Sequence, residues 1–192
     1  MKTLLVSAAF AAALVASSAA SAQAIPAAVV AVVDLDRVTS ECNACKTAAA
    51  TLRSQATAFQ TRRNSLASSL QTEQKSIQAA VDALKGKEPD AALQTRIKNF
   101  QSKAQQDEQD LAGQQQQIQA NQQYIQKQIA DKLSPIYQQV MQRRGANLLM
   151  EVGSTLATAQ SVDVTNDVLT ALNASLPTIS TTAPAQPKPQ GR

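Results

Sequence analysis

Histidine and tryptophan are absent from the 192-residue chain, and aromatic side chains make up only 3% of it. Without histidine, the chain lacks the commonest general base and a frequent zinc ligand, which excludes histidine-based catalytic triads and Cys/His zinc sites. Hydrophobic residues reach 44%, but alanine supplies much of this share and buries little area, so a large globular core is not expected. We predict one domain with no metal, no cofactor and no enzymatic activity.

The first residues have the three parts of a secretory signal peptide. Lys2 precedes an uncharged run over residues 3–16, and small residues follow that fit an A-x-A cleavage pattern twice, ending at Ala22 and at Ala24. The run is too short for a transmembrane helix. We therefore predict that residues 1–22 are a signal peptide, cleaved near Ala22 or Ala24, and that the mature chain works in the bacterial periplasm.

Residues 37–144 carry a heptad repeat of apolar residues in a background rich in Ala, Gln, Ser and Lys. The repeat is interrupted once, by the helix-breaking stretch GKEPD at 86–90, where Gly follows one helix and Pro opens the next. A hydrophobic period of 3.5 residues is typical of coiled coils. We predict two long helices that pack antiparallel, and we call this hairpin the arm and its apolar heptad face the seam.

A turn centred between Glu88 and Pro89 fixes which positions face each other across the arm. In this register most seam positions meet apolar partners, whereas a few layers contain a polar residue and weaken the seam. These polar layers are Glu73/Ala104, Leu70/Asp107, Arg63/Gln114 and Ala56/Asn121.

Short apolar segments flank the arm on both sides. Residues 27–33 are Val-rich and predict a strand, residues 146–152 and 155–160 predict two more around a Gly-Ser turn, and Thr165 is expected to cap a short final helix. The predicted fold class is α+β, mostly α: a small β-rich head that carries a long antiparallel α-helical hairpin.

We assign residues 23–36 and 145–176 to the head, and the Pro-rich residues 177–192 to a disordered tail. The head has roughly 50 residues, which is below the size of a comfortably stable core. Its short apolar strands also leave exposed edges, which other subunits would cover. The sequence therefore predicts an oligomer.

The order of these segments resembles the Skp family, the OmpH-like periplasmic chaperones of outer-membrane proteins. The stretch AVVD at 31–34 resembles the first strand of the family, and residues 147–152 with 155–160 resemble its paired late strands. Asp-Val-Thr at 163–165, with Val-Leu at 168–169, resembles its ending. The resemblance implies a homotrimer whose three arms enclose a cavity for unfolded outer-membrane β-barrel proteins.

The implied function is that of an ATP-independent holdase, which prevents aggregation of its clients during transit to the outer membrane. No Walker motif is present to bind a nucleotide. Apolar residues of the seam would contact clients, although heptad residues more often pack as core. The candidate client-binding residues are Leu52, Phe59, Leu66, Leu70, Ile77, Phe100 and Leu111.

Basic residues concentrate in the outer part of the arm. They would attract acidic clients or make peripheral contact with anionic lipid, or else they form an ordinary solvated helix surface. Nucleic acid is not an expected partner, because the chain is secreted and has no aromatics interleaved with the charges. The candidate electrostatic residues are Arg53, Arg62, Arg63, Lys75, Lys85, Lys87, Arg96, Lys98 and Lys103.

Cys42 and Cys45 form a C-x-x-C pattern at the start of the first arm helix. Such a pattern serves thiol-redox enzymes, but here no βαβ pattern accompanies it, and a structural disulfide in an oxidising compartment is the preferred interpretation. Plain packing of the two thiols is the remaining alternative. A further alternative for the whole chain is a structural coiled-coil adaptor of the cell envelope that binds one folded partner.

Overall fold

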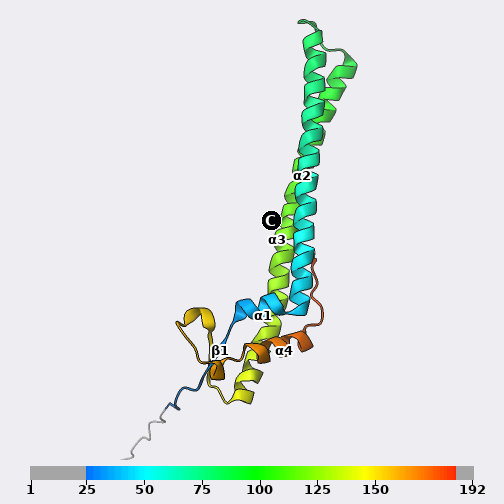
Figure 1. Ribbon diagram of the computed structural model, residues 1–192. Coiled ribbons are helices and arrows are strands. Elements are labelled where there is room, and N and C mark those ends of the chain that lie inside the picture. The colour runs from blue at the N-terminus through cyan, green and yellow to red at the C-terminus, as the bar shows by residue number, and fades with distance from the viewer. Residues whose placement is uncertain (1–24, 185–192) are drawn as a thin grey trace, which may run out of the picture.

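The computed structural model describes residues 25–184, so the predicted signal peptide at 1–22 lies outside the described residues. A long helical hairpin projects from a small base that contains β1 and α4 (Figure 1). This confirms the mostly helical α+β class and the hairpin architecture. In chain order the elements are β1 (Val30–Val33), α1 (Leu35–Glu41), α2 (Asn43–Ala83), α3 (Ala91–Arg144), β2 (Leu148–Glu151), the 3-10 turns η1 (Val152–Ser154) and η2 (Gln160–Val162), and α4 (Thr165–Ser175).

The core of the head is shared by β1 and four helices. Val38 of α1, Val140 of α3, and Val168 and Leu172 of α4 are fully buried and belong to one cluster with β1. All of α1 and the base of α3 therefore belong to the head, although the sequence places residues 37–144 in the arm. Their apolar side chains continue the helical pattern of the seam, so the sequence does not show where the arm ends and the head begins.

Among the residues that the structure describes, the sheet of the head has two strands rather than three. β1 and β2 pair in parallel, with Val30 opposite Leu148 and Val33 opposite Glu151. The predicted strand at 155–160 is wrong, because the chain leaves the sheet after β2 and returns only at residues 163–164, beside β1. There the N–H of Val164 donates to the carbonyl of Val32 at 2.8 Å, which occupies the second edge of β1.

Hydrogen bonds at the helix starts tie the head together. Asp34 caps α1 by accepting from the N–H of Arg37 at 2.8 Å. The expectation that Thr165 caps α4 is wrong: Thr165 is the first residue of that helix, and its N–H donates to Asp163 at 2.8 Å. Its hydroxyl instead accepts from the N–H of Asp34 at 2.9 Å, so this side chain joins the end of β1 to the start of α4.

The arm turns where the sequence predicts, but its register changes along its length. α2 ends at Ala83, and Asp90 caps α3 by accepting from the N–H of Leu93 at 2.8 Å. Near the head, Asn121 donates to Gln55 at 3.0 Å, which is within one position of the predicted layer. Near the tip, however, Glu73 pairs with Arg96 and not with Ala104.

The partner of Glu73 thus lies about two helical turns nearer the start of α3 than predicted. The physical reason is that a guanidinium satisfies a carboxylate at the edge of the seam, whereas an alanine cannot. The heptad period alone does not decide whether Glu73 pairs with Ala104 or with Arg96.

The expected disorder of the tail does not apply to residues 177–184. This segment, red in Figure 1, rises from α4 beside the lower part of α2. Ile179 packs against the head core, and Ser180 and Ala183 form main-chain hydrogen bonds with side chains of α3. Polar side chains on the arm supply these bonds, and composition alone gives no sign of them. Residues 185–192 lie outside the described residues.

Candidate functional site

The seam is only half closed along most of the arm. All seven candidate client-binding residues are partly buried, and none reaches the full burial seen in the head core. In α2 the buried residues are Ala44, Cys45 and Ala48, at the base. In α3 the only residue that the described structure buries before position 121 is Asp107. Apolar side chains along the arm therefore keep part of their surface in contact with solvent.

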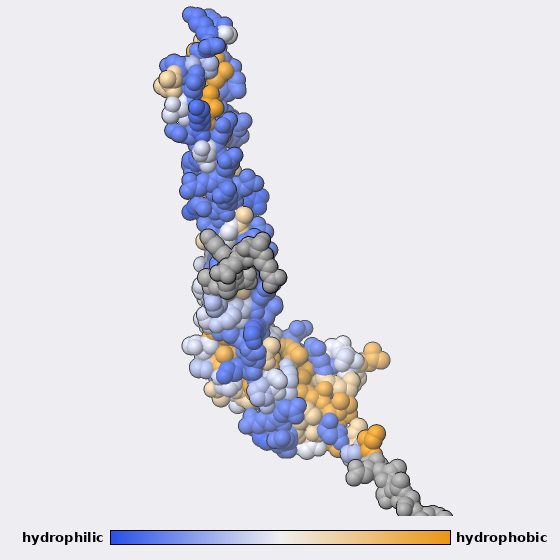
Figure 2. Space-filling model, turned by 180° about the vertical axis from the view of Figure 1, so that it is seen from behind, coloured by the Kyte–Doolittle hydropathy of each residue, from blue (hydrophilic) through white to orange (hydrophobic). Residues whose placement is uncertain are grey.

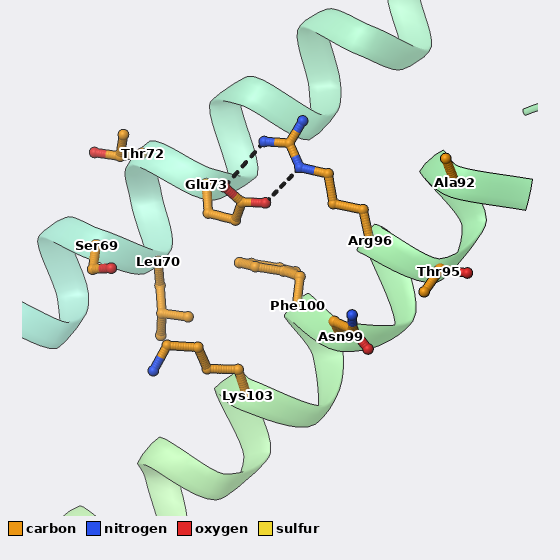
Figure 3. A pocket seen from close by; sticks show the side chains of 10 residues that line it. All are labelled: Ser69, Leu70, Thr72, Glu73, Ala92, Thr95, Arg96, Asn99, Phe100 and Lys103. Carbon is orange, nitrogen blue, oxygen red and sulfur yellow. Dashed lines mark hydrogen bonds and ion pairs between the residues drawn. The ribbon is translucent and has the colours of Figure 1, made fainter. Parts of the chain in front are cut away.

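The outer half of the arm contains a hollow of about 690 Å³ between α2 and α3. In the close-up of Figure 3, Leu70 comes from α2, whereas Phe100 and Lys103 come from α3. The Phe100 ring points between the side chains of Glu73 and Leu70. Leu70 and Phe100, two of the candidate client-binding residues, thus line the same hollow. Charged side chains lie beside them.

A bidentate ion pair closes one side of this hollow. Arg96 donates to the two carboxylate oxygens of Glu73 at 2.7 and 3.0 Å, and also to the hydroxyl of Ser76 at 2.7 Å. The hydrogen bond from Arg96 holds the pKa of Glu73 below its usual range, and the same bond raises the pKa of Arg96. Both groups are therefore charged at neutral pH, and they link the two helices at the level of the hollow.

The candidate basic residues divide into two groups. Three form ion pairs: Arg96 with Glu73, Arg62 with Asp110 at 3.8 Å, and Lys103 with Asp107 at 2.8 Å. The other six are exposed and have no acidic group within 4.0 Å in the part of the chain that the structure describes; they are Arg53, Arg63, Lys75, Lys85, Lys87 and Lys98.

Cys42 and Cys45 are joined by a disulfide at the corner between α1 and α2. Their Cα atoms are 5.1 Å apart, Cys42 is 0% exposed and Cys45 is 7% exposed. Cys42 is also the N-cap of α2. A buried disulfide offers little access to an attacking thiolate, so this environment favours a structural role over thiol-redox catalysis.

Sequence reasoning missed a row of amide side chains on the arm that contacts the tail. Gln55 of α2 and Gln117, Asn121 and Gln128 of α3 bond to one another or to the main chain of residues 180–183. The available signal was Asn121 at a seam position, where an amide is expected to need partners. The chain is so rich in glutamine that composition does not single out the others.

None of the described helices is both long enough and apolar enough to cross a membrane. The solved structures include a similar fold in a proposed outer membrane chaperone (OmpH-like) from Caulobacter crescentus CB15. The two chains share 20% identity with a TM-score of 0.68, over 87% of this chain and 96% of that one. No curated protein matches the sequence.

The sequence profile described as "Outer membrane protein (OmpH-like)" matches residues 29–172. The match includes both strands of the head, the whole arm and most of α4. The chain therefore belongs to the OmpH-like family.

Proposed function

We propose that this chain is an ATP-independent periplasmic holdase that binds unfolded outer-membrane proteins along its arms and prevents their aggregation during transit. The observation that carries the proposal is the half-open seam, because apolar side chains there stay partly accessible over the length of the arm. Many weak apolar contacts on a long surface hold an unfolded chain without requiring a particular sequence. Membership of the OmpH-like family supports the same role.

Enclosure of a client requires more than one arm, and the head offers the surface for assembly. Four large apolar residues of the described chain are exposed there or beside it: Ile25, Val29, Leu148 and Leu156. In Figure 2 the hydrophobic surface gathers at the base, whereas the arm is mainly hydrophilic apart from a strip near its tip. Exposed apolar residues at a strand edge are typical of an interface. We propose that three copies of the chain join through this surface.

The six unpaired basic residues add an electrostatic component to the proposed binding. Exposed cations on the arm attract acidic segments of a client and also anionic lipid headgroups. Both interactions are screened by salt, since the charges are exposed. We therefore expect salt to slow client capture more than it weakens the apolar contacts of a client already bound.

The decisive experiment is suppression of aggregation by the full mature chain. A urea-unfolded outer-membrane β-barrel protein is diluted into buffer, and light scattering follows its aggregation with and without the chain. Replacing Phe59, Leu66, Leu70 and Phe100 by Ser is expected to abolish suppression.

The matched control is Ala67→Ser, which changes an exposed position of α2 next to Leu66. Unchanged suppression by the fourfold variant, with its helix content intact, would show that the seam is not the client site. Failure of the unaltered chain to protect any of several unrelated β-barrel proteins would favour the adaptor function instead.

A further inference from the structure

The tail is held to the arm almost entirely through its main chain. Gln128 contacts both polar main-chain groups of Ser180: its side-chain carbonyl accepts from the Ser180 N–H at 3.0 Å, and its amide nitrogen donates to the Ser180 carbonyl at 2.9 Å. The N–H of Ala183 donates to Asn121 at 2.8 Å. Amide side chains thus satisfy the tail's peptide groups in the way that a neighbouring strand would.

The contacting amides form one connected network across both helices, which we call the amide track (Gln55, Gln117, Asn121 and Gln128). Gln117 donates to Asn121 at 2.8 Å, and Asn121 donates to Gln55 at 3.0 Å. Gln55 and Gln117 also donate to the carbonyls of Thr181 and Ala183, each at 3.4 Å. With the tail in place, Asn121 is only 4% exposed, and its side chain bonds to Gln55, Gln117 and Ala183.

Burial along the tail alternates with a period of two. Ile179, Thr181 and Ala183 are half-buried, whereas Ser180, Thr182 and Pro184 are exposed. This alternation is that of an extended strand with one face against a surface. The side chains that face the arm are small or apolar, and no hydrogen bond between the described tail and the arm uses a tail side chain.

The surface suited to an extended chain continues beyond the end of the described tail. A hollow of about 430 Å³ adjoins Pro184 and is lined by Gly113, Gln116, Gln119 and Gln123 among others. These residues belong to α3: Gln119 and Gln123 lie level with the amide track, and Gly113 and Gln116 lie about one turn nearer the tip of the arm. Amide groups that both donate and accept thus also line the hollow beside the end of the tail.

We propose that the amide track is a binding site for an extended polypeptide backbone, and that the chain's own tail occupies it until an unfolded client displaces the tail. The ligand class is an extended segment with small or apolar residues at every second position. Strands of outer-membrane barrels have this alternation, with apolar side chains on one face only. The inference rests on the proposed holdase function and specifies how one part of the arm reads its clients.

The test uses a fluorescein-labelled ten-residue peptide in which Thr alternates with Val, and fluorescence anisotropy measures its binding. A variant that ends at Ile179 keeps the residue packed on the head but lacks the competing segment 180–192. If the tail occupies the track about nine-tenths of the time, truncation raises the apparent affinity about tenfold. A permuted peptide with all Val residues grouped together is expected to bind more weakly than the alternating one.

Substitutions in the truncated chain identify the track itself. Gln128→Ala is expected to weaken peptide binding severalfold, because it removes the side chain that bonds to both the N–H and the carbonyl of one tail residue. Gln126→Ala is the matched control, since Gln126 is an exposed residue of the same helix. In the full chain, Gln128→Ala is expected to accelerate hydrogen exchange at the Ser180 amide, which tests the tail contact even if truncation disturbs folding.

Two results would overturn the proposal. One is equal peptide affinity for the full and truncated chains, which would make the track only an anchor for the tail. The other is an equal effect of Gln128→Ala and Gln126→Ala. Aggregation assays on the same proteins separate this inference from the proposed function: protection of clients without tail-dependent peptide binding refutes only the track, and tail-dependent binding without protection refutes only the holdase.

Discussion

Truncation of one leucine in the head and one in the arm gives the sharpest test of the half-open seam. Leu172 is 0% exposed in α4, so Leu172→Ala removes buried carbon and leaves a cavity, which costs about 3–5 kcal/mol of unfolding free energy. Leu70 is partly exposed and already borders a hollow of about 690 Å³. Leu70→Ala therefore loses only part of a transfer free energy, about 1–2 kcal/mol, and creates no new enclosed cavity.

Hydrogen exchange read by mass spectrometry reports on the head and the arm separately, because each peptide belongs to one of them. Leu172→Ala is expected to accelerate exchange in α1, β1 and α4, whereas Leu70→Ala acts only on the outer arm. Denaturant unfolding followed by circular dichroism supplies the free energies. Equal costs for the two substitutions would refute the reasoning, since they would mean that the seam around Leu70 is closed and well packed in solution.

Three further predictions concern the head. The hydrogen bond from Thr165 lowers the pKa of Asp163. The stability that this bond contributes is therefore present above the unfolded pKa near 3.8 and is lost as the pH falls through the lower folded value. Asp163→Asn is expected to flatten the acid limb of a plot of unfolding free energy against pH, and an unchanged slope would contradict this. Replacing both Cys42 and Cys45 by Ser opens a four-residue loop, which is expected to cost about 2 kcal/mol in denaturant unfolding on the chain-entropy account without changing client protection; loss of protection at unchanged helix content would revive the redox interpretation. Leu148→Lys places a charge on an exposed apolar position of the strand edge and is expected to lower the native mass from trimer to monomer, whereas an intact trimer would locate the interface elsewhere.

The architecture could be predicted from the sequence because the arm contains a long heptad repeat with one interruption. The heptad identified both helices, and the Gly and Pro between Ala83 and Ala91 identified the turn. Apolar content also identified β1, whose three last residues are buried. The resemblance to the Skp family rested on these segments in this order, and the matched family confirms it.

The failures have a common physical cause, which is that long-range partners decide between locally equivalent patterns. The segment 155–160 has the composition of a strand, but the edge of β1 away from β2 is paired with residues 163–164 instead. Glu73 forms a bidentate ion pair with Arg96, which the heptad pattern does not predict. The tail residue Ser180 is ordered by Gln128, an amide indistinguishable in the sequence from many others. Which seam residues contact a client stays a prediction.

The parallel pairing of the strands determines when the head is able to form during synthesis of the chain. Val29 and Asn147, whose groups bond at the start of the pairing, are 118 positions apart in the chain. β1 is synthesised first, and its partner β2 follows only after the whole arm. Closing so long a loop at random costs roughly 4 kcal/mol in its length-dependent part alone. A hairpin that forms first, starting at its tip, brings β1 and β2 together. The arm therefore also helps the head to fold.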